Sequence, residues 1–357
     1  MSRKATRFLL SLTLSSALVG VWSSSAAAAK LLVTSIFTSS VDLYDTDGTL
    51  LQANFIPPFD SLNPGLNGGL VFPANIITGP NGNIYVSSNL TGHVLMYDRN
   101  TGAPLGVAAD LGASSAPSGL AFDSSGRLYV GDHASNAVQV FDSSSTTVPV
   151  QTISIPTIAP LQQGGGIDFA PDGRLFITSF GTSEVYVYDG STVSLFAGSG
   201  AGGLAIPAGI EVGPDGSVYV ANIFGNSISK FEADGTPVDG PGGPGTPFIT
   251  IPLDQFPVPN GIFFPGNAPG DVIFDANGDL LIPLLGPTNP TETPHPLGGL
   301  VRYSTSGVLL DTLAYPINSA SSLALLEDVE AVPEPTSIAM AVVAVLMGGL
   351  FVRCRRR

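Results

Sequence analysis

The chain has 357 residues, of which 13 are Lys or Arg and 28 are Asp or Glu, so its formal net charge is −15 at neutral pH. This acidic, charge-poor composition argues against contacts with nucleic acid or anionic lipid, which need clustered basic side chains. The single cysteine, Cys354, stands near the C-terminus, so the body of the chain has no disulfide and depends on a packed core.

The first 29 residues have the three parts of a secretory signal peptide. Three basic residues precede an apolar run over 8–22, and small residues then lead to the cleavage pattern Ala27 to Ala29. We therefore expect residues 1–29 to direct export through the inner membrane and to be removed. The mature chain would begin near Lys30. Without its basic C-terminal residues it would carry six Lys and Arg against 28 acidic residues, a net charge near −22.

Five stretches share one pattern: a short apolar strand, a glycine-containing turn and a second apolar strand. They read NIITGPNGNIYVSSN, GLAFDSSGRLYVGDH, GIDFAPDGRLFITSF, GIEVGPDGSVYVANI and DVIFDANGDLLIPLL. Their turn glycines are Gly82, Gly126, Gly173, Gly216 and Gly278. Asx-Gly between alternating apolar runs is a strong hairpin signal, because a type I′ turn needs positive φ at both central residues.

A third strand follows in each repeat. In the first four repeats an aromatic residue stands 15 positions after the turn glycine, and in the fifth the distance is 25. These aromatic residues are Tyr97, Phe141, Tyr188, Phe231 and Tyr303. A sixth, incomplete unit ends at Tyr44, and its first strand would fall before the cleavage site.

Repeats of about 45 residues with three or four strands are typical of β-propeller blades. We therefore predict an all-β fold in which residues 30–328 form a six-bladed β-propeller. The innermost strand missing from the first unit would come from Ser321 to Leu326, which has the required apolar pattern. A ring closed by strands from both ends of the chain would hide sheet edges that could otherwise template aggregation.

The repeats resemble NHL-type propellers and, more distantly, the gluconolactonase-like family of six-bladed propellers. That second resemblance implies a divalent cation such as Ca²⁺, held at the central channel by Glu, Asp and Asn oxygens and acting on a lactone or on water. The repeat register makes Asp132 and Asn222 the candidate ligands, with Asn75 and Asp271 nearby. The VPNG at Asn260 is similar to part of the lactonase pattern but precedes its strand register by eleven residues. Asp132 and Asn222 are equally typical of turn residues that bond their own backbone.

No other pattern in the sequence identifies a catalytic residue. His93, His133 and His295 stand in different repeats without metal-ligand spacing, and no nucleophile is placed beside them. The DTDGT at Asp45 and the EADGT at Glu232 lack the glutamate that completes a calcium loop. We assign no catalytic residue from the sequence.

Two Pro- and Gly-rich insertions, 236–270 and 285–298, interrupt the repeats. In the predicted propeller they lie on one face, and both mature termini lie on the other. Binding residues concentrate on loops that a rigid scaffold holds. The face with the insertions is therefore the predicted binding face.

The C-terminus has a linker over 329–335, an apolar segment over 336–352 and a basic tail over 353–357. The 16 uncharged residues from Ser337 to Val352 would make a helix about 24 Å long, somewhat short of a ~30 Å hydrocarbon core. The terminal arginines favour a transmembrane helix with a cytoplasmic end over a buried core helix. These arginines are Arg353, Arg355, Arg356 and Arg357.

The motif Val332-Pro333-Glu334-Pro335, followed by one apolar helix and a basic cluster, resembles the PEP-CTERM sorting signal of Gram-negative bacteria. In that family an exosortase recognises the Pro-Glu-Pro motif and removes the tail. The resemblance implies an exosortase partner, a transient stay in the inner membrane, and release or attachment at the cell surface.

The sequence thus favours an exported binding or scaffolding module of the cell envelope, with extracellular polysaccharide or a surface protein as partner. The link to an exopolysaccharide matrix is implied by the PEP-CTERM resemblance. A metal-dependent, lactonase-like hydrolase or lyase is the alternative, and a structural surface protein without a small ligand is a third hypothesis.

Overall fold

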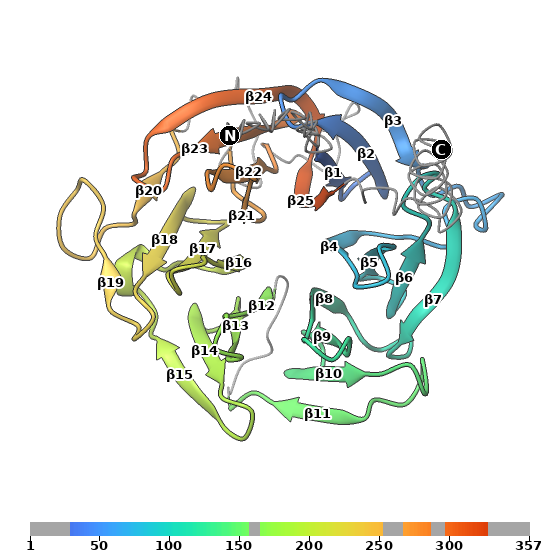
Figure 1. The fold of residues 1–357 in the computed structure, drawn as a ribbon, viewed down its shortest axis with the longest axis horizontal. Coiled ribbons are helices and arrows are strands. Elements are labelled where there is room, and N and C mark those ends of the chain that lie inside the picture. Colours follow the sequence, from blue (N-terminus) through green and yellow to red (C-terminus); the bar gives the residue numbers. More distant parts are fainter. Residues whose placement is uncertain (1–28, 157–164, 253–266, 287–296, 328–357) are drawn as a thin grey trace, which may run out of the picture.

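Six antiparallel sheets stand around a central axis like the blades of a propeller (Figure 1). This computed structural model describes residues 29–156, 165–252, 267–286 and 297–327. The predicted six-bladed, all-β propeller is confirmed for this part of the chain.

The strands of each blade are antiparallel neighbours, ordered from the axis to the rim. Blade 1 contains β25 (Ala320–Leu326), β1 (Lys30–Ser35), β2 (Ser40–Asp45) and β3 (Leu50–Ile56). Blade 2 contains β4 (Pro73–Thr78), β5 (Ile84–Ser88), β6 (His93–Tyr97) and β7 (Pro104–Asp110). Blade 3 contains β8 (Pro117–Phe122), β9 (Leu128–Asp132), β10 (Ala137–Phe141) and β11 (Gln151–Ser154).

The second half of the ring repeats this order. Blade 4 contains β12 (Ile167–Phe169), β13 (Leu175–Ser179), β14 (Glu184–Tyr188) and β15 (Val193–Ala197). A short 3₁₀ helix, η1 (Ala201–Gly203), precedes blade 5. Blade 5 contains β16 (Pro207–Val212), β17 (Val218–Asn222), β18 (Ser227–Phe231), β19 (Pro237–Val238) and β20 (Ile249–Thr250). Blade 6 contains β21 (Ile273–Phe274), β22 (Leu280–Leu284), β23 (Leu297–Tyr303) and β24 (Leu309–Asn318).

The hairpins between the first and second strands form at the predicted turn glycines, but they are not type I′ turns, because the residue before each glycine does not have positive φ. All five glycines have positive φ, from 78° at Gly82 to 90° at Gly173, where a residue with a Cβ would be strained. The Gly82 amide donates to the Gly79 carbonyl at 2.8 Å, and the other four turns repeat this bond. We name the side of the disc that carries these turns the turn face, and the opposite side the loop face.

The C-terminal strand closes the ring against the N-terminal strand, as predicted (Figure 1). In the antiparallel pair of β25 and β1, Leu323 lies opposite Val33, and Ala324 lies opposite Leu32. Lys30 pairs with Leu326 at the position where the other blades have their turn. The chain therefore enters and leaves the propeller at the turn face.

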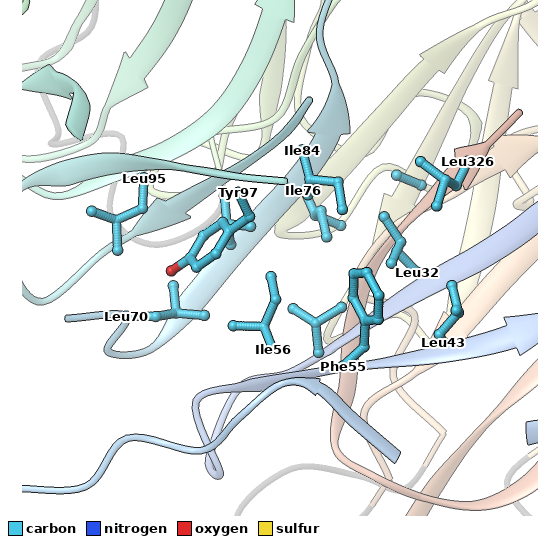
Figure 2. Close-up of a cluster of buried hydrophobic side chains, with 13 residues drawn as sticks. Leu32, Leu43, Phe55, Ile56, Leu70, Ile76, Ile84, Leu95, Tyr97 and Leu326 are labelled. Carbon is cyan, nitrogen blue, oxygen red and sulfur yellow. The ribbon is translucent and has the colours of Figure 1, made fainter. Parts of the chain in front are cut away.

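Apolar side chains of adjacent blades fill the space between their sheets. Figure 2 shows one such cluster, in which Leu32 and Leu326 of blade 1 lie near Ile84 and Tyr97 of blade 2. All four side chains are buried, and burial of a large apolar side chain contributes roughly 1.5–3 kcal/mol. These contacts hold each blade to the next.

The first insertion differs in part from the prediction. Residues 236–270 do not form a single loop on one face, because β19 and β20 both pair with β18 and complete the rim of blade 5 (Figure 1). The second insertion connects β22 to β23, at the loop face. Residues 253–266 and 287–296, with Asn260 and His295, lie outside the described residues.

Within the described ranges, no helix is both long and apolar enough to cross a membrane. The predicted signal peptide, apart from Ala29, lies outside them. So do the linker 329–335 with its Pro-Glu-Pro motif, the segment 336–352 and the basic tail 353–357.

Candidate functional site on the propeller axis

Asp132 ends β9 and is 1% exposed. Its Oδ1 atom accepts hydrogen bonds from the Ala116 amide at 2.9 Å and the Ala134 amide at 3.2 Å. Its Oδ2 atom accepts a bond from the Ser135 hydroxyl at 2.6 Å. The carboxyl of Asp132 thus joins the connection that enters blade 3 to the connection between β9 and β10.

Asn222 ends β17 and is fully buried. Its Oδ1 atom accepts a hydrogen bond from the Ala205 amide at 3.0 Å. Its Nδ2 atom donates to the hydroxyls of Ser227 at 3.2 Å and Ser229 at 2.9 Å. The side chain of Asn222 therefore bonds to residues at blade 5. Blade 4 lies between Asn222 and Asp132.

A divalent cation, which the gluconolactonase resemblance implies, needs several hard oxygen ligands directed at one point. Asp132 and Asn222 do not fit this requirement, because each uses its oxygen atoms within its own blade. Among the residues that the structure describes, no three His, Cys, Asp or Glu side chains could hold one metal ion.

The inner strands approach closely around the axis. A Cβ atom added to Gly119 would lie 2.4 Å from the Gly165 carbonyl oxygen, and one added to Gly166 would lie 2.4 Å from the Ala208 oxygen. Backbone hydrogen bonds join these blades. The Gly119 amide donates to Gly165 at 3.0 Å, and the Gly166 amide to Ala208 at 3.1 Å. The axis of blades 3 to 5 is thus tied by the backbone itself.

Side-chain oxygens make similar links at two junctions between neighbouring blades. Each accepts a hydrogen bond from the backbone amide of the next inner strand. The Leu120 amide donates to the Asn75 Oδ1 atom at 3.1 Å, and the Val212 amide donates to the Asp168 Oδ2 atom at 2.8 Å. We name Asp168, Glu211 and Asp271 the axial carboxyls. They belong to blades 4, 5 and 6.

Asp271 also fixes the seam where the ring closes. The Ser322 hydroxyl on β25 donates to the Asp271 Oδ2 atom at 2.5 Å. The Asn75 Nδ2 atom on β4 lies 3.3 Å from the same oxygen and 3.1 Å from the Ser322 Oγ atom. Asp271 is 5% exposed. Blades 6, 1 and 2 therefore meet in one buried polar network.

Asp271 is buried, Asp168 and Glu211 are half-buried, and the pKa values of all three are raised. Burial raises the pKa of Asp168 to about 6. Burial, with a smaller repulsion from Asp168, raises the pKa of Asp271 to about 7. The pKa of Glu211 lies well above its usual range because of burial and the nearby charges of Asp168 and Asp271. A desolvated carboxyl beside others of the same sign retains its proton to higher pH.

The histidines of the described residues lie apart. The His93 Nε2 atom on blade 2 is 3.4 Å from an Asp110 carboxylate oxygen. His133 lies on blade 3, where burial lowers its pKa. The arrangement does not bring either histidine to the axial carboxyls.

Asp168 and Glu211 carry a signal in the sequence that the repeat analysis did not use. Both stand five residues before the turn glycine, in the stretches GIDFAPDG and GIEVGPDG. The other three repeats have Ile77, Ala121 and Ile273 at this position. An acidic residue inside an apolar inner strand, repeated in two consecutive blades, marks the axial position.

An NHL repeat model matches residues 115–141, which contain β8, β9 and β10. No curated protein matches the sequence.

Several solved structures have a similar fold. Virginiamycin B lyase from Staphylococcus aureus has a TM-score of 0.52 and 15% identity, with 84% of this chain and 89% of that chain covered. A protein of unknown function from Bacteroides caccae has a TM-score of 0.58 and 14% identity, covering 85% and 100%. A gluconolactonase from Xanthomonas campestris has a TM-score of 0.50 and 20% identity, covering 70% and 78%. The chain is thus a six-bladed β-propeller with an NHL repeat, similar in structure to virginiamycin B lyase and gluconolactonase.

Proposed function

We propose that this propeller is an exported binding module of the cell envelope that contacts an extracellular polysaccharide through its loop face. The signal-peptide pattern over 1–29 supports export. The Val332-Pro333-Glu334-Pro335 motif and the arginines after the apolar segment support sorting by an exosortase, because they resemble a PEP-CTERM signal. Release or display at the cell surface would follow removal of the tail.

The observation that favours a binding role over a catalytic one is the hydrogen bonding of the polar side chains near the propeller axis. The polar side chains there accept hydrogen bonds from the next blade, and Asp132 and Asn222 bond within their own blades. Lactonase-like chemistry would need oxygen ligands free to hold a metal. The side chains at the axis therefore stabilise the fold, and we expect a ligand to bind at the surface loops.

The loop face is the side available to a partner. Both chain ends leave from the turn face, so a membrane-held propeller would present its loop face outward. The connection from β3 to β4 lies on the loop face and exposes Phe59, Leu62 and Leu66 by 39%, 87% and 56%. Apolar side chains on loops of a rigid scaffold favour contact with a ligand over a purely structural role.

Two experiments test this proposal. Cells with and without the sorting enzyme are fractionated, and the released protein is applied to the polysaccharide of the same cells and to a glycan array. We expect the tail to be lost in normal cells and the released protein to bind polysaccharide. Double replacement of Leu62 and Leu66 by Asp should weaken binding, whereas Leu310→Asp on the rim should not. Full-length protein in the inner membrane of normal cells would overturn the sorting proposal. Failure to bind polysaccharide, or capture of a surface protein instead, would overturn the proposed ligand.

A further inference from the structure

We propose that the loop face binds an uncharged polysaccharide, whose sugar rings stack on two aromatic pairs at opposite sides of the propeller axis. This inference rests on the proposed function and narrows it to one class of ligand.

Two pairs of phenylalanines lie on loop-face connections. Phe37 lies between β1 and β2, Phe72 directly precedes β4, and their ring centroids are 6.3 Å apart at an interplanar angle of 77°. Phe180 directly follows β13, Phe224 lies between β17 and β18, and their centroids are 6.2 Å apart at 72°. We name Phe37 with Phe72 the first platform, and Phe180 with Phe224 the second platform.

The rings of the platforms are partly open to solvent. Phe224 is 40% exposed, and the other three rings are half-buried. The negative face of an aromatic ring attracts the weakly positive C–H groups on the face of a sugar ring. A half-buried phenylalanine offers such a face while its other side packs against the protein.

The two platforms occupy equivalent places in the ring. The first joins blades 1 and 2, and the second joins blades 4 and 5, so they lie on opposite sides of the axis (Figure 1). A polysaccharide presents similar sugar rings at intervals along its chain, so it offers the same group to both platforms. Contact at two sites raises the overall affinity above that of either site.

Hydroxyl groups flank the two platforms in the same arrangement. The stretches SIFTS, from Ser35, and SFGTS, from Ser179, share a Ser, a Thr three positions later and a second Ser. The Thr38 hydroxyl donates to the Ser35 Oγ atom at 2.6 Å, and the Thr182 hydroxyl donates to the Ser179 Oγ atom at 2.8 Å. Hydroxyl groups both donate and accept hydrogen bonds, as a neutral sugar requires.

The backbone at both platforms is held in an unusual conformation. Phe72 and Ile206, which precede β4 and β16, have φ of 57° and 53°, values that are rare for large or β-branched residues. The Phe72 amide donates to the Ser39 Oγ atom and the Ile206 amide to the Ser183 Oγ atom, both at 3.0 Å. The Ile206 carbonyl accepts a bond from the Ile223 amide at 3.2 Å, which fixes the connection that carries the exposed ring of the second platform. Rings held in this way lose little conformational freedom when a ligand binds.

Charge separates the two faces of the disc and favours an uncharged ligand. Between residues 30 and 327 the sequence has six Lys and Arg, and all six lie at the turn face or at strand ends next to it. They are Lys30, Arg99, Arg127, Arg174, Lys230 and Arg302. The loop face has Asp60, Asp110 and Glu184 instead. An anionic polysaccharide would be repelled by these carboxylates and would find no Lys or Arg to bind it.

The two described histidines of the loop face do not replace these basic residues. The His93 Nε2 atom lies 3.4 Å from an Asp110 carboxylate oxygen, which offsets any charge on the ring. Burial lowers the pKa of His133, so its ring is neutral near pH 7. Neither histidine therefore makes the loop face attractive to an anion.

The first test uses the wild-type protein purified from normal cells. It is titrated with the neutral and the acidic fractions of the polysaccharide of the same cells, separated by anion exchange. We expect it to bind the neutral fraction with the same affinity at about 0.05 M and about 0.5 M NaCl, because salt does not screen an uncharged ligand. Equal or stronger binding of the acidic fraction, or an affinity that falls with salt, would overturn this inference and leave the proposed function standing. Failure to bind either fraction would overturn both.

The second test separates stacking from simple apolar contact. Phe224→Leu keeps an apolar side chain without a ring face, whereas Phe224→Tyr keeps the ring. We expect Phe224→Leu to weaken binding of the neutral fraction by roughly threefold to tenfold and Phe224→Tyr to retain it. The matched control is Tyr315→Leu on the rim strand β24, because Tyr315 is 41% exposed and Phe224 is 40% exposed. Wild-type affinity in Phe224→Leu, or an equal loss in Tyr315→Leu, would refute stacking at the second platform.

Discussion

Leu323→Ala is the sharpest test of ring closure by the two ends of the chain. Leu323 is 1% exposed and packs with Leu31 of its own blade and with Leu281 and Leu300 of blade 6. Its truncation removes three carbon atoms from a site whose neighbours are held in hydrogen-bonded strands and cannot collapse. Leu→Ala changes at such sites cost 2–5 kcal/mol, and this rigid setting places the expected loss near 3–4 kcal/mol.

Equilibrium unfolding in urea measures this loss, provided that the unfolding free energy of variant and wild type depends equally on urea concentration. Leu310→Ala on the outer strand β24 is the control, because Leu310 is 50% exposed. Its expected cost is below about 0.5 kcal/mol. A cost for Leu323→Ala below about 1 kcal/mol would mean that β25 is not seated in blade 1, and the closed ring would be wrong.

Two further predictions concern contacts between blades. Gly209→Ala should destabilise the propeller by about 2 kcal/mol or more, because the new Cβ would lie 2.3 Å from the Asp271 Oδ1 atom, whereas Gly198→Ala, with open space around it, should change thermal stability little. Equal midpoints for the two alanine variants would contradict the close approach at the axis. Arg302→Ala should cost about 3 kcal/mol, because it leaves the 7%-exposed Asp275 without its partner at 3.1 Å. Replacing Arg302 by Met and Asp275 by Asn together should recover most of this loss in chemical unfolding, because an amide oxygen can still accept the bonds from the Asn277 and Asp279 amides, and no recovery would show that the pair has another role.

The blades could be predicted from sequence because their signals are local. An Asx-Gly turn between apolar strands specifies a hairpin within about a dozen residues, and four such turns and one Ser-Gly turn recur in phase. The closing strand followed from counting, since the first unit lacked an inner strand and Ser321 to Leu326 had the right pattern. The structure extends that strand by one residue, to Ala320.

The hydrogen-bond partners of the polar side chains near the axis could not be predicted in the same way. Register placed Asp132 and Asn222 at the ends of their strands, but register does not show that the Ala116 and Ala205 amides occupy their oxygens. Asp168 lies in the middle of its strand, where the repeat register does not predict a ligand. The amide of Val212 that bonds it belongs to another blade, a contact that only the folded ring creates.

The rim of blade 5 escaped prediction for a different reason. Its outer strand is split into β19 and β20, two residues each, with a Gly- and Pro-rich loop over 239–248 between them. Pairs this short lack the alternation by which a strand is recognised in sequence. Composition alone therefore described the whole segment as a loop.

The most direct measurement of the central claim is thermal unfolding of the mature chain at about pH 8, in excess chelator and in millimolar Ca²⁺. The central claim is that the axis joins the blades and does not hold a catalytic metal. We expect Ca²⁺ to have the same effect on wild type and on Glu211→Gln, since any ion held by surface loops would act on both. Suppose that Ca²⁺ raises the unfolding temperature of the wild type by several degrees and that Glu211→Gln abolishes this rise. That result would contradict the claim and indicate a metal-dependent site on the axis.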